Sequence, residues 1–458
     1  MKMAVSPDLA YVGNTANQSS KGGVVMLHFK FSIFLIAILL ILCPSLVYAR
    51  WTFTPRLYVE EEYDDNLFLE ETDEQDDLIT TVSPGVNLEY ETPTADVALD
   101  YELRRSLYRD FSDLDFTGHR GRVEARKDFG PRFSAGIREI FIKSEDPIEL
   151  TGIRDFERPS VRIGERNKYT RNILQPDITL HFGERRSFGL QYLNNTLRND
   201  REDIADQDHN AFDLLFVFDF NAHNGIELFY EHVKRDYDPT TPPEISRDHD
   251  GDEIRGRYIY RFDPRTSVFA ECRYYERLFD RAFFDYQVYE PKLGFSRDLF
   301  ENVSFSASAG YTIRETDATD RDDDETFFGR LDLSRRHERL TAHVYAETGF
   351  DEDFSSAENR GFSEFWVAGL NSTYQLVERL SLGGFFFVER DDFVDVDRTD
   401  RLWRIRGSLS YEVVKKWLFL SFDYIYDKRD SNLAFESYTD NRYIGRITTQ
   451  FEFEELFQ

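Results

Sequence analysis

The chain alternates apolar and polar residues over long stretches, and residues 400–427 show the pattern clearly. Between Trp403 and Val413 the odd positions are apolar or glycine, whereas the even positions are arginine, serine or glutamate. Because successive side chains of a β-strand point to opposite faces, this period of two predicts an amphipathic strand. The pattern resumes from Leu418 to Tyr426, which predicts a second strand and therefore a hairpin.

Twenty segments with this alternation follow one another along the chain. They are residues 52–63, 77–91, 95–109, 118–128, 132–144, 168–182, 187–199, 210–220, 225–237, 250–262, 266–279, 284–297, 303–314, 326–336, 340–350, 362–375, 380–390, 400–413, 417–428 and 439–453. Tight links such as 92–94, 129–131 and 414–416 alternate with longer, acidic connections. The sequence therefore predicts an all-β fold, a transmembrane antiparallel up-and-down β-barrel of about 20 strands (range roughly 16–20), with short periplasmic turns and longer acidic external loops.

Two other arrangements of these strands fit the pattern less well. A soluble β-sandwich needs shorter strands and gives no reason for the regular alternation of link length. An open sheet would leave backbone groups unpaired in lipid, whereas a closed barrel pairs them all. The four tryptophans, Trp51, Trp366, Trp403 and Trp417, fall near predicted strand ends, where an interfacial aromatic girdle would place them.

Composition is consistent with a barrel whose apolar residues are separated by polar ones. Hydrophobic residues make up 41% of the chain and charged residues 31%, and the formal net charge is −30. Alternating strands give a weak hydropathy signal even when one face contacts lipid. The strong acidity argues against nucleic acid as a partner. The expected partners are outer-membrane lipid, lipopolysaccharide and the barrel-assembly machinery.

The first 49 residues have the features of a leader. A start at Met26 would be followed by His28 and Lys30, an apolar run over 31–43, and a small-residue site that predicts cleavage after Ala49. Residues 26–49 are thus a predicted signal peptide and 50–458 the predicted barrel domain. The alternative, a single transmembrane anchor, is disfavoured because the run is short. We expect export through the inner membrane and location in the outer membrane.

Two motifs at the start of the predicted barrel resemble those of a known family. They are Tyr63-Asp64-Asp65-Asn66-Leu67-Phe68 and, within residues 77–86, Ser83-Pro84-Gly85; Tyr101, Tyr108 and His119 also fit. Over about residues 58–119 the chain resembles the outer-membrane beta-barrel porin family often found beside exopolysaccharide export systems. One departure is the C terminus, which ends Leu456-Phe457-Gln458 where bacterial barrels usually end on an aromatic residue.

This resemblance implies a transport role and no catalytic residues. It adds export of an extracellular polysaccharide as the specific expectation, with periplasmic polysaccharide-export components as partners. The function expected from the residues themselves is a channel for passive passage of hydrophilic solutes. A non-conducting barrel that acts as an assembly or surface-interaction platform is the alternative, and an outer-membrane enzyme is a further one. A TonB-type transporter is disfavoured because no plug domain precedes the first predicted strand.

Closure of the predicted barrel would bring two groups of arginines to the same arc of the lumen. The candidate lining residues are Arg104, Arg120, Arg122, Arg126, Arg404, Arg406, Arg442 and Arg446. Such a basic wall would draw in anionic solutes. The alternative is that these arginines pair with acids of the same files, namely Asp96, Asp100, Glu102, Glu124, Glu412 and Glu452. Inward Phe229, Phe385 and Phe387 would be either an apolar track for sugars or filler.

The longest predicted loop, residues 145–167, carries four arginines, Arg154, Arg158, Arg162 and Arg166. We hypothesise that it folds inward as a constriction; an external loop that covers the rim is the alternative. The acidic loops could bind divalent cations, or they could be solvated and mutually repelling. Residues 248–253 resemble part of a calcium loop but lack its full spacing. No catalytic, cofactor-binding or metal-binding residues are predicted, because no nucleophile motif or metal-spaced histidine pair is present.

Overall fold

A computed structural model describes most of the chain from Ala49 onward. The described residues are 49–145, 148–149, 160–161, 168–201, 205–238, 248–280, 285–317, 324–353, 361–394, 397–433 and 436–457. All of them belong to one compact unit that begins at Ser45. The predicted signal peptide, apart from Ala49, and the four arginines of the predicted constriction loop lie outside the described residues.

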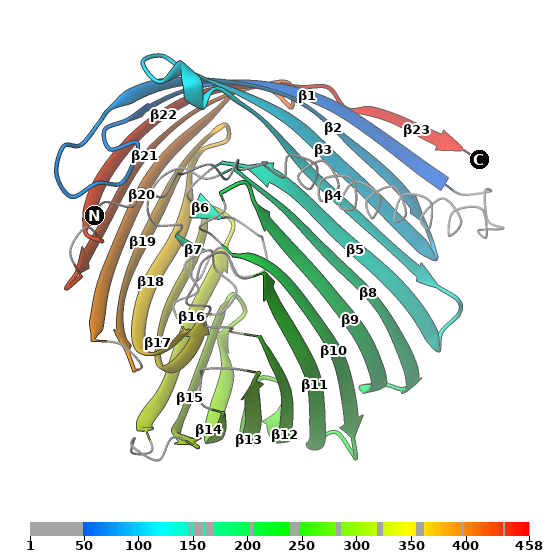
Figure 1. Cartoon of the computed structure of the whole chain (residues 1–458). Helices are drawn as coiled ribbons and strands as arrows, with labels where there is room; N and C mark the ends of the chain where they lie inside the picture. Colours follow the sequence, from blue (N-terminus) through cyan, green and yellow to red (C-terminus); the bar gives the residue numbers. More distant parts are fainter. Residues whose placement is uncertain are drawn as a thin grey trace, which may run out of the picture. The chain divides into compact units, whose positions relative to one another are not determined.

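Twenty long strands form one antiparallel sheet that closes on itself (Figure 1). The long strands are β1 (Ala49–Asp64), β2 (Asp77–Thr92), β3 (Ala95–Tyr108), β4 (Phe116–Asp128), β5 (Phe133–Ser144), β8 (Tyr169–Gly183), β9 (Arg186–Asn199), β10 (Asp206–Asp219), β11 (Asn224–Asp238), β12 (His249–Asp263), β13 (Thr266–Phe279), β14 (Tyr286–Phe300), β15 (Val303–Thr316), β16 (Asp324–His337), β17 (Leu340–Asp353), β18 (Gly361–Val377), β19 (Leu380–Phe393), β20 (Arg398–Val414), β21 (Leu418–Ser431) and β22 (Tyr438–Gln450). The shorter elements are η2 (Ser112–Leu114), β6 (Ile148–Glu149), β7 (Ser160–Val161) and β23 (Phe453–Phe457). The predicted fold class and strand number are confirmed.

The first strand closes the barrel by pairing on both of its edges. One edge pairs with β2, and the other pairs with β22 from Arg56 opposite Gln450 to Asp64 opposite Arg442. After a break at residues 451–452, β23 continues this edge and pairs with the start of β1. The last strand is therefore interrupted and runs on to Phe457, which shows how the unusual C-terminal segment is accommodated.

The connections differ in length at the two ends of the barrel. Tight turns such as 92–95, 263–266 and 414–418 lie at the same end as the start of β1 and the end of β23. In one of them Phe129 donates its backbone N–H to Phe133 across 2.9 Å, and Gly130 takes a positive φ of 123°. The opposite end carries the longer connections. By the rule for outer-membrane barrels, the turn end is periplasmic and the loop end is external.

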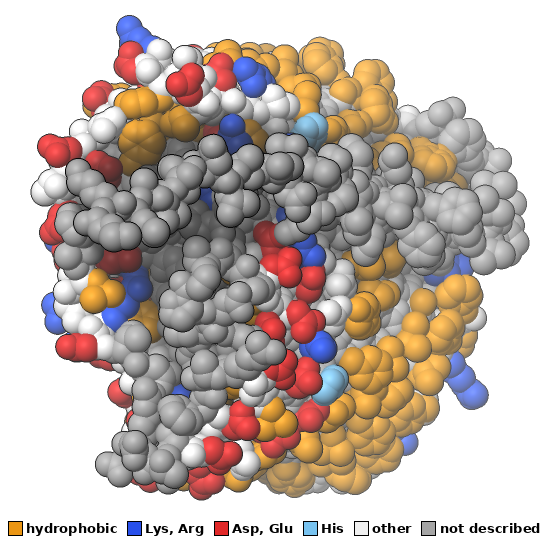
Figure 2. Space-filling view, in the orientation of Figure 1, with side chains coloured by type: hydrophobic (Ala, Val, Ile, Leu, Met, Phe, Trp, Pro, Cys, Tyr) orange, Lys and Arg blue, Asp and Glu red, His pale blue; other side chains and the backbone are white. Residues whose placement is uncertain are grey.

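The outer face of the barrel is apolar, with a polar rim. Trp403, Ile405 and Leu409 of β20 are about 40% exposed, and Figure 2 shows hydrophobic side chains gathered over the outer face. Toward the external end, outward tyrosines donate their hydroxyl hydrogens to polar groups: Tyr192 to Asn210, Tyr230 to Asp252, Tyr274 to Glu276 and Tyr311 to Glu325. Among the described residues no helix has the length and hydropathy needed to cross a bilayer.

Candidate functional site

The barrel interior is lined by the polar face of each strand, as the sequence predicted. On β20 to β22 the arginines of this face are paired with acids. Arg406 lies 2.9 Å from Asp423, and Arg404 binds Asp427. Arg442 also binds Asp427, at 2.9 Å. Cross-strand neighbours on the same face of a sheet account for these pairs. The candidate lining arginines of this arc are therefore neutralised.

The second arginine group, on β3 and β4, is only partly neutralised. Arg104 lies 3.1 Å from Glu60 of β1, and Arg446 of β22 binds the same carboxylate, so closure brings both groups to one residue. Arg122 lies 2.6 Å from Glu124. Among the described residues, no carboxylate lies within 4.0 Å of Arg120 or Arg126, although Arg126 donates a long hydrogen bond to Ser134.

The acids that hold these arginines are mostly different from those proposed from the sequence. Asp100 and Glu102 bind Arg56 of β1 instead, Asp100 through two contacts of 2.6 Å. Only Glu124 of the proposed acids pairs with a candidate arginine. Alternation identifies the face of a strand on which a residue lies. The position of each charged residue along the barrel axis depends on the register between strands, which the sequence pattern does not predict.

Charged residues at the external end of β20 to β22 are buried although they face the interior. Asp400 and Arg429 are 0% exposed and bind each other, and Arg398 lies 3.0 Å from Asp400. Asp440 and Arg442 are also buried, 3.1 Å apart. We call these five residues, with Asp427, the β20–β22 charge cluster. In a water-filled lumen such groups would be exposed, so other parts of the chain cover them.

Loop 1, residues 65–76 between β1 and β2, folds into the external mouth beside this cluster. Asn66 is 0% exposed, and its amide nitrogen donates to the backbone oxygens of Glu70, at 2.7 Å, and of Thr439 in β22, at 2.9 Å. Its amide oxygen accepts from the backbone N–H of Glu70 at 2.9 Å. Leu67 donates its N–H to Gln75, which closes the loop as a hairpin. Asn66 thus stabilises the loop internally, through Glu70, and also joins it to β22, the strand that closes the barrel against β1.

The apolar residues of loop 1 are packed inside the barrel. Leu69, 9% exposed, belongs to a hydrophobic cluster with inward residues of β17 to β20 and β22: Tyr345, Phe365, Val367, Phe387, Leu402 and Tyr438. Leu67 packs with Ile79 and Tyr108. Loop 1 was not predicted to fold inward, because it is shorter than the loop at 145–167. The signal that could have found it is the apolar triplet 67–69 inside an otherwise acidic connection.

A second packed region joins strands that are not neighbours in the sheet. Arg277 of β13 lies 3.1 Å from Glu352 of β17, and Tyr286 of β14 donates to the same carboxylate at 2.6 Å. Arg314 of β15 stacks on the rings of Tyr286 and of Phe362 in β18, 4.7 and 4.3 Å from their centroids. Because β13 and β18 are separated by four strands, these contacts draw the external end of this wall inward. We call this the β13–β18 cluster.

Farther from the mouth, opposite charges alternate across four neighbouring strands. Glu271 of β13, fully buried, binds Arg257 of β12 and lies 2.9 Å from Lys292 of β14. The series continues to Glu227, Glu290, Arg273 and Glu253. This charge ladder lies on the inner face of β11 to β14. Two of the inward phenylalanines considered as a track for sugars are not open to a solute: Phe229 is covered by Arg255, and Phe387 is buried. The geometry therefore favours the alternative, that these rings only fill space within the wall.

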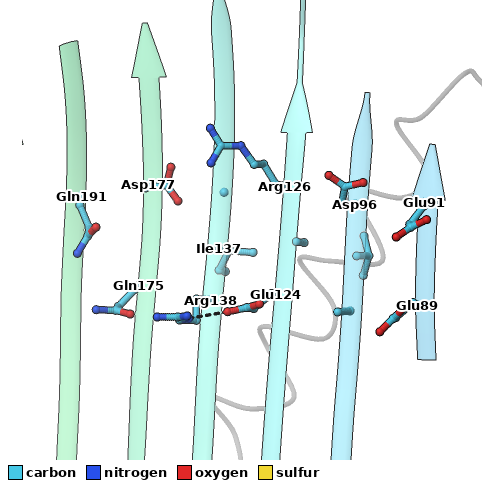
Figure 3. A pocket seen from close by; sticks show the side chains of 14 residues that line it. Glu89, Glu91, Asp96, Glu124, Arg126, Ile137, Arg138, Gln175, Asp177 and Gln191 are labelled. Atoms are coloured by element: carbon cyan, nitrogen blue, oxygen red, sulfur yellow. Dashed lines mark hydrogen bonds and ion pairs between the residues drawn. The ribbon is translucent and has the colours of Figure 1, made fainter. Parts of the chain in front are cut away.

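A cavity of about 550 Å³ opens in the inner wall at the periplasmic end of β2 to β9. Figure 3 shows Arg126 extending from β4 across β5 toward Asp177 of β8, while Arg138 binds Glu124 at 2.6 Å. Gly136 allows this arrangement, because a Cβ there would lie 2.4 Å from Asp177 Oδ1. The remaining lining includes Glu89, Glu91, Asp96, Gln175 and Gln191. The wall therefore offers carboxylates, guanidinium groups and carboxamides together.

The structure does not bring the calcium-like segment 248–253 together as a site. Asp252 lies on the outer face, where it accepts from Tyr230, whereas Glu253 faces inward and binds Arg273. Across the described ranges, no group of three histidine, cysteine or acidic residues is arranged to hold a metal ion.

Comparison with known proteins identifies the type of barrel. Residues 225–451, from β11 to just after β22, match the model of the family described as Putative beta-barrel porin 2. This is the family expected from the sequence, but the matched region does not include the motifs in 58–119 on which the resemblance rested. Among curated proteins, none matches the sequence.

Solved structures share the fold at low identity. The siderophore receptor PirA from Pseudomonas aeruginosa gives a TM-score of 0.50 at 12% identity, over 88% of this chain and 80% of its own. The FrpB iron transporter from Neisseria meningitidis gives 0.53 at 9% identity, over 87% and 82%. PirA from Acinetobacter baumannii gives 0.53 at 8% identity, over 88% and 80%. At these identities the likeness shows the fold alone.

Proposed function

Because the chain is an outer-membrane β-barrel of the Putative beta-barrel porin 2 family over residues 225–451, we propose that it is a channel for passive passage of hydrophilic solutes. The observation that carries this proposal is the exposure of charged side chains on the inner wall of the barrel. Arg122 and Arg406 face the interior of a closed barrel, and their side chains are 50% and 49% exposed. Charged groups with that exposure need water around them, which supports a hydrated passage along the wall.

The solute proposed is a saccharide, with an extracellular polysaccharide as the specific candidate. The resemblance of residues 58–119 supports this choice, and so does the cavity of Figure 3, whose carboxylates, guanidinium groups and carboxamides can exchange hydrogen bonds with hydroxyl groups. Periplasmic polysaccharide-export components, lipopolysaccharide and the barrel-assembly machinery are the proposed partners. Delivery by a signal peptide cleaved after Ala49 belongs to the same proposal.

The test is single-channel recording of the refolded barrel in planar bilayers. We expect discrete conductance steps, and we expect saccharide oligomers added to one side to reduce the current in a concentration-dependent way. Absence of steps from protein that shows the heat-dependent gel mobility of a folded barrel would contradict the channel. Steps that no saccharide affects would contradict the solute class alone.

A non-conducting platform is the second candidate, and the packing of the external mouth favours it. The β20–β22 charge cluster and the β13–β18 cluster fill much of the inner wall there with buried side chains. If the mouth were filled all round, the same recordings would show no conductance. In that case the external rim would be the functional surface.

A further inference from the structure

We propose that loop 1 is a docked constriction of the external mouth and that its acidic tip makes the passage prefer cations. This inference rests on the proposed channel function. Long-range contacts fix the loop, because Asn66 binds Thr439 of β22 and Leu69 packs into the cluster that reaches β17. The loop therefore extends over the inner face of β17 to β22 rather than outward from the rim.

The conformation of the loop is built into its residues. Leu69 and Asp73 take left-handed φ values of 57° and 65°, which turn the chain sharply on either side of the tip. Leu69 N–H donates to the backbone oxygen of Asn66 at 3.0 Å, and Asp65 N–H donates to that of Asn441 at 3.2 Å. A loop held at its base by Asp65 and Asn66 and before its tip by Leu69 reduces the open area of the mouth whenever it is docked.

The charge of the tip is not offset by the described residues of the wall beneath it. Glu70, Glu71, Asp73, Glu74 and Asp76 are exposed, and no basic residue occurs between residues 57 and 103. The nearest arginines of β20 to β22 are engaged with Asp400, Asp427 and Asp440, as described above. Docking of the loop therefore places a net negative field at the entrance, and such a field enriches cations and depletes anions there.

Two loop variants test the constriction. Because Leu67 and Gln75 are already joined by a 2.8 Å backbone hydrogen bond, residues 68–74 can be replaced by a short Gly-containing turn that leaves β1 and β2 in place. Leu69→Asp keeps the length of the loop but puts a carboxylate into the apolar cluster, which undocks it. We expect both variants to show a larger single-channel conductance than the wild type, with unchanged heat-dependent gel mobility.

A charge variant tests the selectivity. Replacement of four tip acids by their amides, E70Q/E71Q/D73N/E74Q, should lower the cation-over-anion permeability ratio several-fold in a salt gradient, because each removed charge contributes a screened Coulomb energy that favours cations and disfavours anions. The matched control, D110N/D113N/D250N/E315Q, removes four acids from the β3–β4 connection and the outer face. It should leave the ratio unchanged.

The outcomes separate this inference from the proposed function. If the wild type conducts and every loop variant matches it in conductance and selectivity, the constriction is wrong although the channel stands. If only the shortened-loop and Leu69→Asp variants conduct, the channel proposal fails for the wild type and loop 1 is a closed plug. If neither the wild type nor any variant conducts, both proposals are wrong.

Discussion

Asn66 is the residue on which docking of loop 1 depends most, so Asn66→Ala should release the loop. The substitution removes three side-chain hydrogen bonds of 2.7, 2.9 and 2.9 Å from a position with no exposure to water. At about 1 kcal/mol for each hydrogen bond, the docked state loses about 3 kcal/mol, which is a shift of roughly 100-fold in the docking equilibrium. The backbone oxygen of Thr439 is also left without this donor.

Limited proteolysis of the folded barrel measures this shift. Although Glu70, Glu71 and Glu74 are exposed in the docked loop, a glutamate-specific protease needs several residues in an extended conformation around the bond that it cuts. It should therefore cut the loop mainly after the loop leaves the wall, so the cutting rate follows the undocked population. We expect Asn66→Ala to be cut up to about 100-fold faster than the wild type. Asn66→Asp should be cut nearly as fast, because a carboxylate keeps the shape but cannot donate to the two backbone oxygens.

The control is Asn87→Ala, which truncates an inward asparagine of β2 whose side chain makes no hydrogen bond among the described residues. It should be cut at the wild-type rate. The temperature at which the folded gel band disappears should be the same for all of these proteins, because the effect is confined to the loop. Equal cutting of Asn66→Ala and Asn87→Ala would refute the role of Asn66 as the anchor.

Three further predictions concern the wall. Glu271→Gln leaves Arg257 and Lys292 without the buried carboxylate between them, so we expect a loss of about 3 kcal/mol in denaturant unfolding in detergent; an unchanged midpoint would show that the charge ladder is not structural. Leu409→Arg, on the lipid face, should cost about 2–4 kcal/mol in the same assay in lipid vesicles, and a neutral result would place this face away from lipid. Arg120→Gln should raise the cation-over-anion permeability ratio about two-fold; the outward Arg105→Gln is its control, and equal ratios would exclude Arg120 from the passage.

The barrel could be predicted from the sequence because its main determinant is local. Alternation within each strand sets which side chains face lipid, and the short connections, such as residues 263–266, force antiparallel neighbours. Most of the observed strands extend beyond the predicted ones by a few residues: the strand predicted at 400–413 spans Arg398–Val414. The final strand was predicted as continuous, whereas it is broken at residues 451–452.

The interior could be predicted only in part, because its contacts are not local. Arg104 and Arg446 were expected on one arc, and they do meet, but at Glu60, which no sequence pattern singled out. Asn66 contacts Thr439, 373 positions away, and no periodicity encodes such a pair. Length alone predicted an inward loop at 145–167, a prediction that stays untested. It did not identify loop 1, which folds inward because Leu69 packs in an apolar cluster.

The distribution of buried charge indicates where a solute would pass. Burial of paired charges costs desolvation free energy, and the pairs of the β20–β22 charge cluster and the β13–β18 cluster offset it only by good geometry and mutual hydrogen bonds. This packing occupies the external end of the wall from β13 through β22. On β4, in contrast, Arg122 keeps half of its side-chain exposure and Arg120 has no carboxylate partner within the described ranges. If the barrel conducts as we propose, the hydrated part of the inner wall therefore includes Arg122 of β4 and the cavity of Figure 3.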